Sequence, residues 1–560
     1  MHTQHPLELT ELLQGFGKVG FEDQAGFDAM LDEWDRFLEW EVANGQNGVE
    51  WILLWAKSYE AFADSPLRIH RLATLTAHAH AFGIAAGIDA PIAFNQQHSF
   101  RLLRKTGDLE VELAEIRQRI DWLMGTDFDF LGTESGTSEF THPEPDRMLA
   151  WMNEVTRHLD EAHDHTPVNI KVHCSTGQVA DGYTDPGTNT PTNFNMLARH
   201  ADQRLGVLAH TVQHYGLDDP APTYGNENFG YMLDFLLEEV GQRPVFYYPE
   251  MTYWVSFDVD VPLFLPLYAE RRLSDLRLIA QREDAGLAGR GHHAGKRMDG
   301  QFIFSSGWEW GYWLGDVVAA RAGWNPHVEA SDWRSAMHAL LRPVERVFGD
   351  AGADVVDWIG DVAQSERSLL IEGRVDGKVP SDIVRRNGQA YLQGWETWDD
   401  VNTLVESLPT QATMSTQPAK LGLVEMRNPA HAGPGYSKEI EPLLGEMETT
   451  FAELASRGEA LRARIPPSER DLFDDLADAM QMTALRALQV HGLYDYVDGA
   501  LALNQSTRRA RLADARRALD AAARVVALRE PRYRVPANRV ASWRPNPTAY
   551  AWGYLWTVRR

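Results

Sequence analysis

Seven short apolar runs, separated by longer stretches of helical character, constrain the fold of this chain more than any other feature. The runs lie at 49–56, 82–92, 128–132, 168–174, 205–210, 245–249 and 302–306. The stretches between them, expected to be helices, lie at about 24–43, 66–80, 108–124, 144–162, 192–203, 229–240 and 264–282. This alternation predicts a parallel sheet covered by helices, because parallel strands need a long crossover connection and a helix supplies it.

An eighth strand would close such a sheet into an α/β fold of the (β/α)8 TIM-type barrel class, which needs about 250–400 residues. We place this missing strand first in the chain, around Leu13 to Phe21, in a short Gly-rich segment before residue 24. The alternative is an open doubly wound sheet. That fold usually carries a Gly-rich phosphate loop after an early strand, and the sequence shows none.

The pattern changes at about residue 327, where strand signals end. Long helical stretches follow at 329–348, 350–373, 381–406, 438–463, 467–500 and 505–529. The segment at 407–436 is rich in Thr, Gln, Gly and Pro, which is typical of a loop or linker. We therefore predict two domains, a barrel over residues 1–326 and an α-helical domain over residues 327–560.

The charge and cysteine content narrow the range of partners. The formal net charge is -27, and an acidic chain is a poor ligand for nucleic acid or for an anionic membrane surface. No run of about 18 apolar residues is present, so we expect no membrane span. Cys174 is the one cysteine, which rules out an intrachain disulfide and a Cys-rich zinc site.

The N-terminal segment MHTQHPLELTELL lacks the basic segment and apolar core of a signal peptide. A single cysteine fits a reducing compartment, but bacterial secreted enzymes often lack disulfides as well. The sequence therefore leaves localisation open, between the cytoplasm and secretion after loss of a signal peptide. It also leaves the oligomeric state open.

Two of the predicted strands deliver a glutamate at their carboxyl ends. Glu134 follows FDFLGT and Glu250 follows VFYYP. If the first strand is the one before residue 24, Glu134 ends strand four and Glu250 ends strand seven, where barrel enzymes carry catalytic groups. Glycosidic bonds are cleaved by two carboxyls, one a proton donor and the other a nucleophile or a base for water. We predict that Glu134 and Glu250 form such a pair, with no metal and no cofactor.

This pattern resembles the large group of (β/α)8 glycoside hydrolases with an acid/base Glu after strand four and a nucleophile Glu after strand seven. The resemblance covers about residues 1–325 and implies that Glu134 is the acid/base and Glu250 the nucleophile. That group usually has Asn directly before the acid/base, and here Thr133 stands there, so no specific family is assigned. A helical bundle behind a barrel also looks like some hexosaminidases and α-glucuronidases.

Further residues near the strand ends are predicted to bind a carbohydrate. Along strand 168–174 the apolar residues alternate with polar ones, so Lys171 and His173 should line the barrel interior. A polar interior must be hydrogen-bonded, and it suits a polyhydroxylated ligand. The predicted substrate-binding set is Asp89, Lys171, His173, His210, Tyr248, Tyr253, Trp254, Trp308, Glu309 and Trp310.

Some members of this set carry a second interpretation. Glu309, in SSGWEWGYW, is the best replacement for either catalytic residue, and Glu139 is another. Trp308 and Trp310 are expected to form part of a platform for a sugar ring. The alternative is that one of these two tryptophans belongs to the hydrophobic core. Lys171 lies deeper in its strand, where it could instead pair with a buried acid.

Two other functions compete with the glycosidase prediction. His78, His80, His173, His210 and Asp316 superficially resemble the metal-ligand order of an amidohydrolase-like barrel enzyme. The His-Ala-His pair precedes its strand, however, and so falls at the opposite pole of the barrel. The third possibility is a non-catalytic carbohydrate-binding protein on a degenerate barrel.

Overall fold

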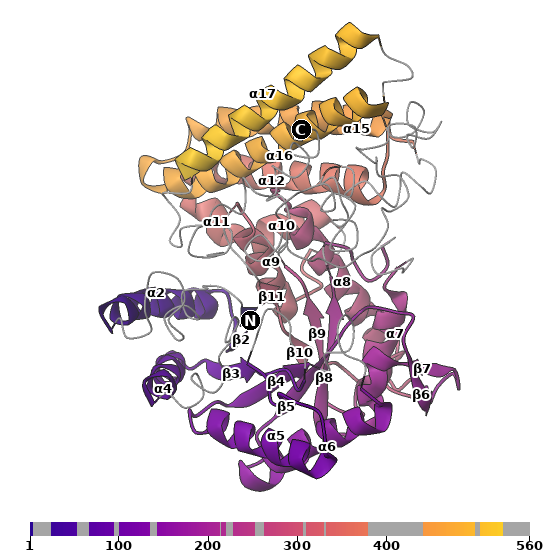
Figure 1. The fold of residues 1–560 in the computed structure, drawn as a ribbon. Coiled ribbons are helices and arrows are strands. Elements are labelled where there is room, and N and C mark those ends of the chain that lie inside the picture. Colours follow the sequence, from indigo (N-terminus) through magenta and orange to yellow (C-terminus); the bar gives the residue numbers. More distant parts are fainter. Residues whose placement is uncertain are drawn as a thin grey trace.

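The computed structural model places an α/β part at one end of the molecule and a helical C-terminal region at the other (Figure 1). It describes residues 1–3, 24–52, 66–93, 100–134, 143–212, 214–219, 228–251, 263–305, 310–329, 332–378, 392, 441–498 and 504–529 of the 560-residue chain.

Parallel strands form the centre of the α/β part. In chain order they are β1 (His2–Thr3), β2 (Gly48–Ile52), β3 (Ala85–Asp89), β4 (Phe130–Glu134), β5 (Val168–Val172), β8 (Leu205–Thr211), β9 (Val245–Pro249), β10 (Gly300–Gln301) and β11 (Phe304–Ser305). From β1 to β10 each strand pairs in parallel with the next in this order.

The segment 300–305 closes this sheet into a barrel. Its first half, β10, pairs with β9, and its second half, β11, pairs with β1. A bridge between Glu250 and Phe304, and a hydrogen bond from the Met251 N–H to the Phe304 carbonyl oxygen (2.8 Å), continue the contact with β9. One broken strand therefore joins both edges, and the (β/α)8 class predicted from the alternation is confirmed.

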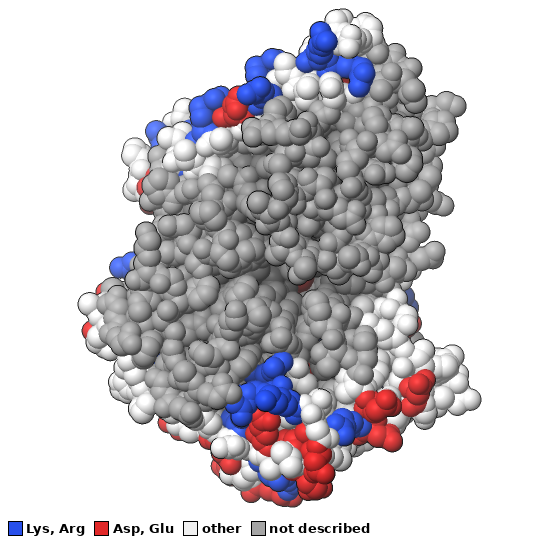
Figure 2. Space-filling view, in the orientation of Figure 1, with Lys and Arg blue, Asp and Glu red and all other residues white. Residues whose placement is uncertain are grey.

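Helices follow the strands and cover the outside of the barrel (Figure 1). They are α2 (Gln24–Ala43), α4 (Pro66–Ala81), α5 (Leu109–Met124), α6 (Pro145–Ala162), α7 (Gly230–Glu239), α8 (Leu267–Asp284) and α9 (Trp313–Trp324). Most bounds lie within three residues of the predicted ones. Figure 2 shows acidic and basic side chains intermixed at the lower end of the molecule, where Figure 1 places α5 and α6.

One prediction for the barrel was wrong, and another was met only in part. The first sheet position is taken by His2–Thr3, whereas the predicted segment from Leu13 to Phe21 lies outside the described residues. A strand of two residues leaves no alternation to detect. The helix predicted at 192–203 is a 3-10 helix, η2 (Phe194–His200), and the hairpin of β6 (Val179–Thr184) and β7 (Pro191–Asn193) before it was not predicted.

The C-terminal region is helical, as predicted. It contains α10 (Trp333–Leu340), α11 (Arg342–Val347), α12 (Gly352–Glu366) with a π-helical turn at Arg367–Ile371, α15 (Glu441–Arg462), α16 (Arg470–Asp498) and α17 (Gln505–Arg529). The predicted helix at 381–406 and the linker at 407–436 fall almost wholly outside the described residues, and the boundary at residue 326 stays a prediction. In the described part of the chain, no helix has the length and apolar character that crossing a membrane requires.

The helical region packs on the loops that follow strand seven, which is β9, and strand eight, which is the broken strand of β10 and β11. After strand seven, the Phe264 N–H donates to Thr483 Oγ1 on α16 (2.9 Å). After strand eight, the Asp475 carboxylate on α16 accepts from the N–H groups of Trp310 (3.0 Å) and Gly311 (2.8 Å). Loops after barrel strands lie at the carboxyl end, so the helical region sits at the end where barrel enzymes hold their catalytic groups.

The hydrophobic core lies between the sheet and the helices and continues into the helical region. Val168, Ile170 and Val172 of β5 all belong to it, which confirms the predicted direction of that strand. Inside the barrel, a smaller cluster contains Leu208, Tyr248 and Phe304. The two faces of each strand therefore serve different purposes, one for packing and one for the barrel interior.

We predict that Asp475→Ala lowers the melting temperature, at a cost of roughly 2–4 kcal/mol, because three donors lose a buried acceptor: two backbone N–H groups and Trp313 Nε1. Thermal unfolding followed by circular dichroism measures the change. Asp520→Ala, at an exposed position on α17, is the matched control and should leave the melting temperature unchanged. Equal effects of both variants would contradict an anchoring role for Asp475.

Candidate active site

The inner face of the barrel gathers polar side chains near the carboxyl ends of its strands. The register places Glu134 of β4 directly beside Lys171 of β5, and His210 of β8 beside Tyr248 of β9. Glu250 follows β9 and bridges to Phe304. Glu134 therefore ends the fourth strand and Glu250 follows the seventh, at the positions predicted from the sequence.

A buried ion pair lies at the centre of this group. Lys171 Nζ donates to Glu134 Oε1 at 3.0 Å, and both side chains are almost fully buried. Burial by itself lowers the pKa of Lys171, but the charges of Glu134, Asp89 and Glu250 outweigh it and raise the pKa. Lys171 is thus a permanent cation among acids, which matches the expectation that it pairs with a buried carboxylate.

Glu50 of β2 is a further member of the group that the sequence analysis did not single out. It is 1% exposed and points across the inner face towards β4. A Cβ atom on Gly132 would lie 2.0 Å from Glu50 Oε1, so a residue without a side chain is needed there. The sequence signal was a lone acid in the run VEWILLWA, since a charged residue in a buried strand needs a partner.

Asp89 lies at the end of β3, and its surroundings favour the protonated form of its carboxyl. Burial raises its pKa well above the ordinary value, the charges of Glu134 and Glu50 raise it further, and Lys171 opposes them. Its Oδ1 atom is buried and has no hydrogen-bond partner among the described residues. Asp89 is therefore a neutral carboxyl that can donate a proton inside the barrel.

Two histidines line the same interior. His210 Nδ1 donates to the Tyr248 carbonyl oxygen at 2.9 Å, which turns Nε2 towards Glu250 Oε1 at 3.9 Å. The His173 ring lies 5.5 Å from the His210 ring. Burial and the charge of Lys171 lower the pKa of His173 to about 3, so this imidazole is neutral. Both rings can bind hydroxyl groups.

Tyr248 lies deeper than a residue of the barrel mouth. It is 1% exposed and packs with Phe304 and Leu208. Burial raises the pKa of its phenol well above 10, and the charges of the neighbouring acids, Glu50 among them, add to this effect. The phenol is therefore a neutral hydroxyl that faces the acids.

The aromatic mouth is only partly described. Trp310 is 1% exposed and belongs to the hydrophobic core, so its side chain offers no face to a sugar ring, contrary to the platform prediction. The alternative interpretation, that one of the two tryptophans belongs to the hydrophobic core, fits Trp310, whose backbone N–H donates to the buried Asp475 carboxylate. The remaining predicted residues, Glu139, Tyr253, Trp254, Trp308 and Glu309, lie outside the described residues.

Two of the four histidines expected for the competing metal hydrolase lie away from the barrel interior. His78 Nδ1 contacts Asp35 (2.6 Å) and His80 Nε2 contacts Asp129 (2.8 Å), and both lie on helix α4 outside the barrel. Asp316 on α9 is buried and accepts a hydrogen bond from Ser305 Oγ (2.9 Å). In the part of the barrel interior that the structure describes, no three His, Cys or carboxylate groups lie at metal-ligand spacing.

The described site combines a neutral carboxyl, ionisable carboxylates, one ammonium and two imidazoles in a buried space. Proton donors and acceptors therefore face each other where water is largely excluded, which strengthens their electrostatic interactions. Such a set can protonate a leaving oxygen and present a carboxylate to an electrophilic carbon. It is the chemistry that bond cleavage in a polyhydroxylated substrate needs.

Comparison with known proteins shows a likeness of fold. No protein-family model matches the sequence, and no curated protein matches it. Among solved structures, a GH138 enzyme targeting pectin rhamnogalacturonan II is similar, with a TM-score of 0.54 and 10% sequence identity over 94% of this chain and 77% of that chain. At this identity the likeness shows the shared fold, which extends through the helical region.

Two further solved structures, CpGH84B and CpGH84D, each have a TM-score of 0.38 and 10% identity. The matches cover 95% and 88% of this chain, and 74% and 67% of theirs. Scores at this level carry no argument for a common fold or function.

We predict that Asp89→Asn raises the melting temperature at pH 7.5 by about 2 °C or more. In the folded protein the raised pKa makes ionisation of Asp89 costly. This cost is absent below the ordinary pKa near 3.8, grows as the pH rises through the folded-state pKa, and is complete above it. The gain in the variant should therefore shrink as the pH falls towards 4.

Thermal unfolding of both proteins across this pH range measures the effect. Asp181→Asn, at an exposed position on the β6–β7 hairpin, is the control and should show no such dependence. A variant less stable than the wild type at pH 7.5 would show that the Asp89 carboxyl stabilises the fold.

Proposed function

We propose that this protein is a glycoside hydrolase that cleaves a carbohydrate with Glu134 and Glu250 as its carboxyl pair. The observation that carries the proposal is their placement near the carboxyl ends of strands four and seven, facing one barrel interior. The likeness of fold to a GH138 enzyme targeting pectin rhamnogalacturonan II adds support, because that enzyme acts on a carbohydrate. Hydroxyl-binding groups, His173, His210 and Tyr248, surround the pair.

The surroundings of the two glutamates suggest how the proton is handled. Lys171 Nζ donates a hydrogen bond to Glu134 Oε1 at 3.0 Å, whereas burial raises the pKa of Asp89 well above its ordinary value, so Asp89 keeps a proton. The charge of Glu134 raises the pKa of Asp89, so the two carboxyls share one proton in this proposal. A substrate that displaces Lys171 from Glu134 would move the proton onto Glu134, the acid/base of the proposal.

The bond changes then follow the two-carboxylate scheme for retaining enzymes. The Asp89–Glu134 pair gives its proton to the glycosidic oxygen as the bond to the anomeric carbon breaks. The Glu250 carboxylate forms a bond to that carbon. Water then attacks the glycosyl ester, and Glu134 takes its proton, which restores the starting state.

No specific observation favours the metal-dependent amidohydrolase, since two of its four expected histidines, His78 and His80, lie on α4 with aspartate partners. A carbohydrate-binding protein without activity would show no turnover, and it would need no buried proton donor such as Asp89. Turnover, its response to EDTA and the effect of the glutamine variants separate these possibilities.

We predict that the purified chain hydrolyses at least one member of a panel of aryl glycosides and oligosaccharides, and that EDTA leaves this activity intact. Glu134→Gln and Glu250→Gln should each lower kcat by about 10²–10⁴-fold, because each removes a group that acts in the transition state. Glu110→Gln, at an exposed position on α5, is the matched control and should keep full activity. Release of the aryl group, followed by absorbance, measures the rates.

The outcomes distinguish the three functions. Activity lost to EDTA but kept in both glutamine variants would overturn the carboxyl pair in favour of a metal hydrolase. Binding of an oligosaccharide by calorimetry without turnover would favour the binding protein. Proton NMR of the first product formed would show whether the anomeric configuration is retained, as the covalent scheme requires.

A further inference from the structure

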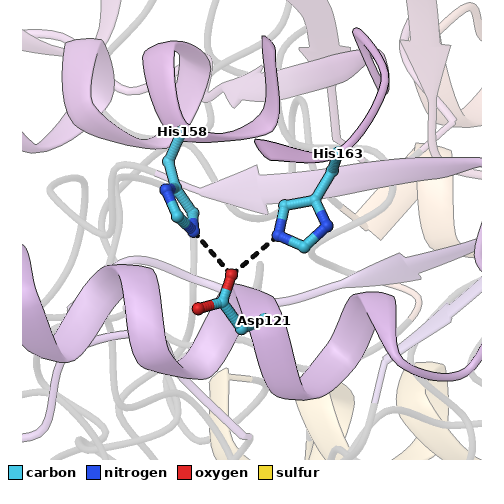
Figure 3. A group of neighbouring side chains, drawn as sticks. All are labelled: Asp121, His158 and His163. Carbon is cyan, nitrogen blue, oxygen red and sulfur yellow. Dashed lines mark hydrogen bonds and ion pairs between the residues drawn. The ribbon is translucent and has the colours of Figure 1, made fainter. Parts of the chain in front are cut away.

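Asp121, in the last turn of α5, meets two histidines on the outside of the barrel (Figure 3). His158 comes from α6 and His163 from the residue that ends it. The Nε2 atoms of His158 and His163 lie 2.6 Å and 2.7 Å from the same oxygen, Asp121 Oδ1. The three possible ligand atoms all lie within 4.8 Å of one another.

We propose that Asp121, His158 and His163 form a binding site for a divalent transition-metal ion of the zinc type. Two imidazole nitrogens and one carboxylate oxygen are a ligand set that Zn²⁺ takes at about 2.0–2.2 Å, with a water molecule in the fourth position. Tetrahedral ligands at that distance stand about 3.4 Å apart. The Asp121 side chain is 54% exposed, so it can withdraw from the two rings by that small amount.

The charges at this cluster suit a cation. The described partners of Asp121 are the two imidazoles, with no Lys or Arg side chain among them. A bound divalent ion would supply the positive charge that no described Lys or Arg side chain brings to Asp121.

A second cluster with similar spacing already has a positively charged side chain bound to it. Glu441, His491 and Asp495 also lie close enough to share an ion. However, Arg511 Nε already donates to Asp495 Oδ2 at 2.7 Å, so a guanidinium supplies the positive charge there. The comparison singles out the Asp121 cluster as the one that gains most from a metal ion.

Backbone hydrogen bonds hold the segment around His163, and the cluster is open to solvent. The His163 N–H donates to the Leu159 carbonyl oxygen (3.2 Å), and the Thr166 N–H donates to the His163 carbonyl oxygen (3.0 Å). An open depression of about 430 Å³, lined by His163 among others, adjoins the cluster. Because α5 and α6 end where β4 and β5 begin, the site lies at the opposite pole from Glu134, independent of the proposed hydrolysis.

The test is titration of the metal-stripped full-length chain with ZnCl2 by isothermal calorimetry at pH 7.5. We expect one equivalent to bind at this site. Asp121→Asn, His158→Gln and His163→Gln should each weaken this binding at least about tenfold, the loss seen even for residues that only orient metal ligands. Zinc should also raise the melting temperature of the wild type but not of these variants, since a ligand stabilises only the protein that binds it.

The controls are chosen from the same pole. His80→Gln and His165→Gln alter surface histidines that also contact an aspartate, and both variants should bind zinc like the wild type. Glu134→Gln should do so as well, which separates this site from the proposed active site. Absence of zinc binding, or binding that survives in the Asp121, His158 and His163 variants, would overturn the proposal.

Discussion

The ion pair between Lys171 and Glu134 is the interaction on which the barrel interior depends. Four carboxyl groups, those of Glu50, Asp89, Glu134 and Glu250, are buried there. Each isolated charge would cost several kcal/mol to remove from water, so the set requires compensation. One ammonium supplies part of it, and a proton kept on Asp89 supplies another part. The charge balance thus creates both an acid and a base in one enclosed space.

Two glycines leave space for the side chains of the barrel interior. Gly132 leaves the volume that the Glu50 carboxylate occupies, and Gly87 on β3 leaves room for the ring of Phe130, which a Cβ would approach within 2.2 Å. These glycines stand on the inner face, where side chains from neighbouring strands compete for one narrow volume. The acids are therefore held in place by packing as well as by charge.

The helical region forms hydrogen bonds with the loops that follow the last two barrel strands. Asp475 and Thr483 of α16 accept hydrogen bonds from backbone N–H groups after strands eight and seven, and Glu366 of α12 accepts from the N–H of Leu267 at the start of α8. Trp358 of α12 stacks on the Phe264 ring with centroids 5.6 Å apart. These contacts tie the loop ends at the barrel mouth to a second set of helices. The helical region is thus part of the framework of the site.

The sequence by itself determined the class of fold, the order of the elements and the strand ends on which Glu134 and Glu250 stand. Alternation of period two and period 3.6 is a local property, and so it also gave the inward direction of Lys171. Tertiary structure alone decided the rest: the two-residue first strand, the entry of Glu50 into the acid group, the proton on Asp89 and the burial of Trp310. Each depends on register and closure between segments far apart in the chain, which no local pattern records.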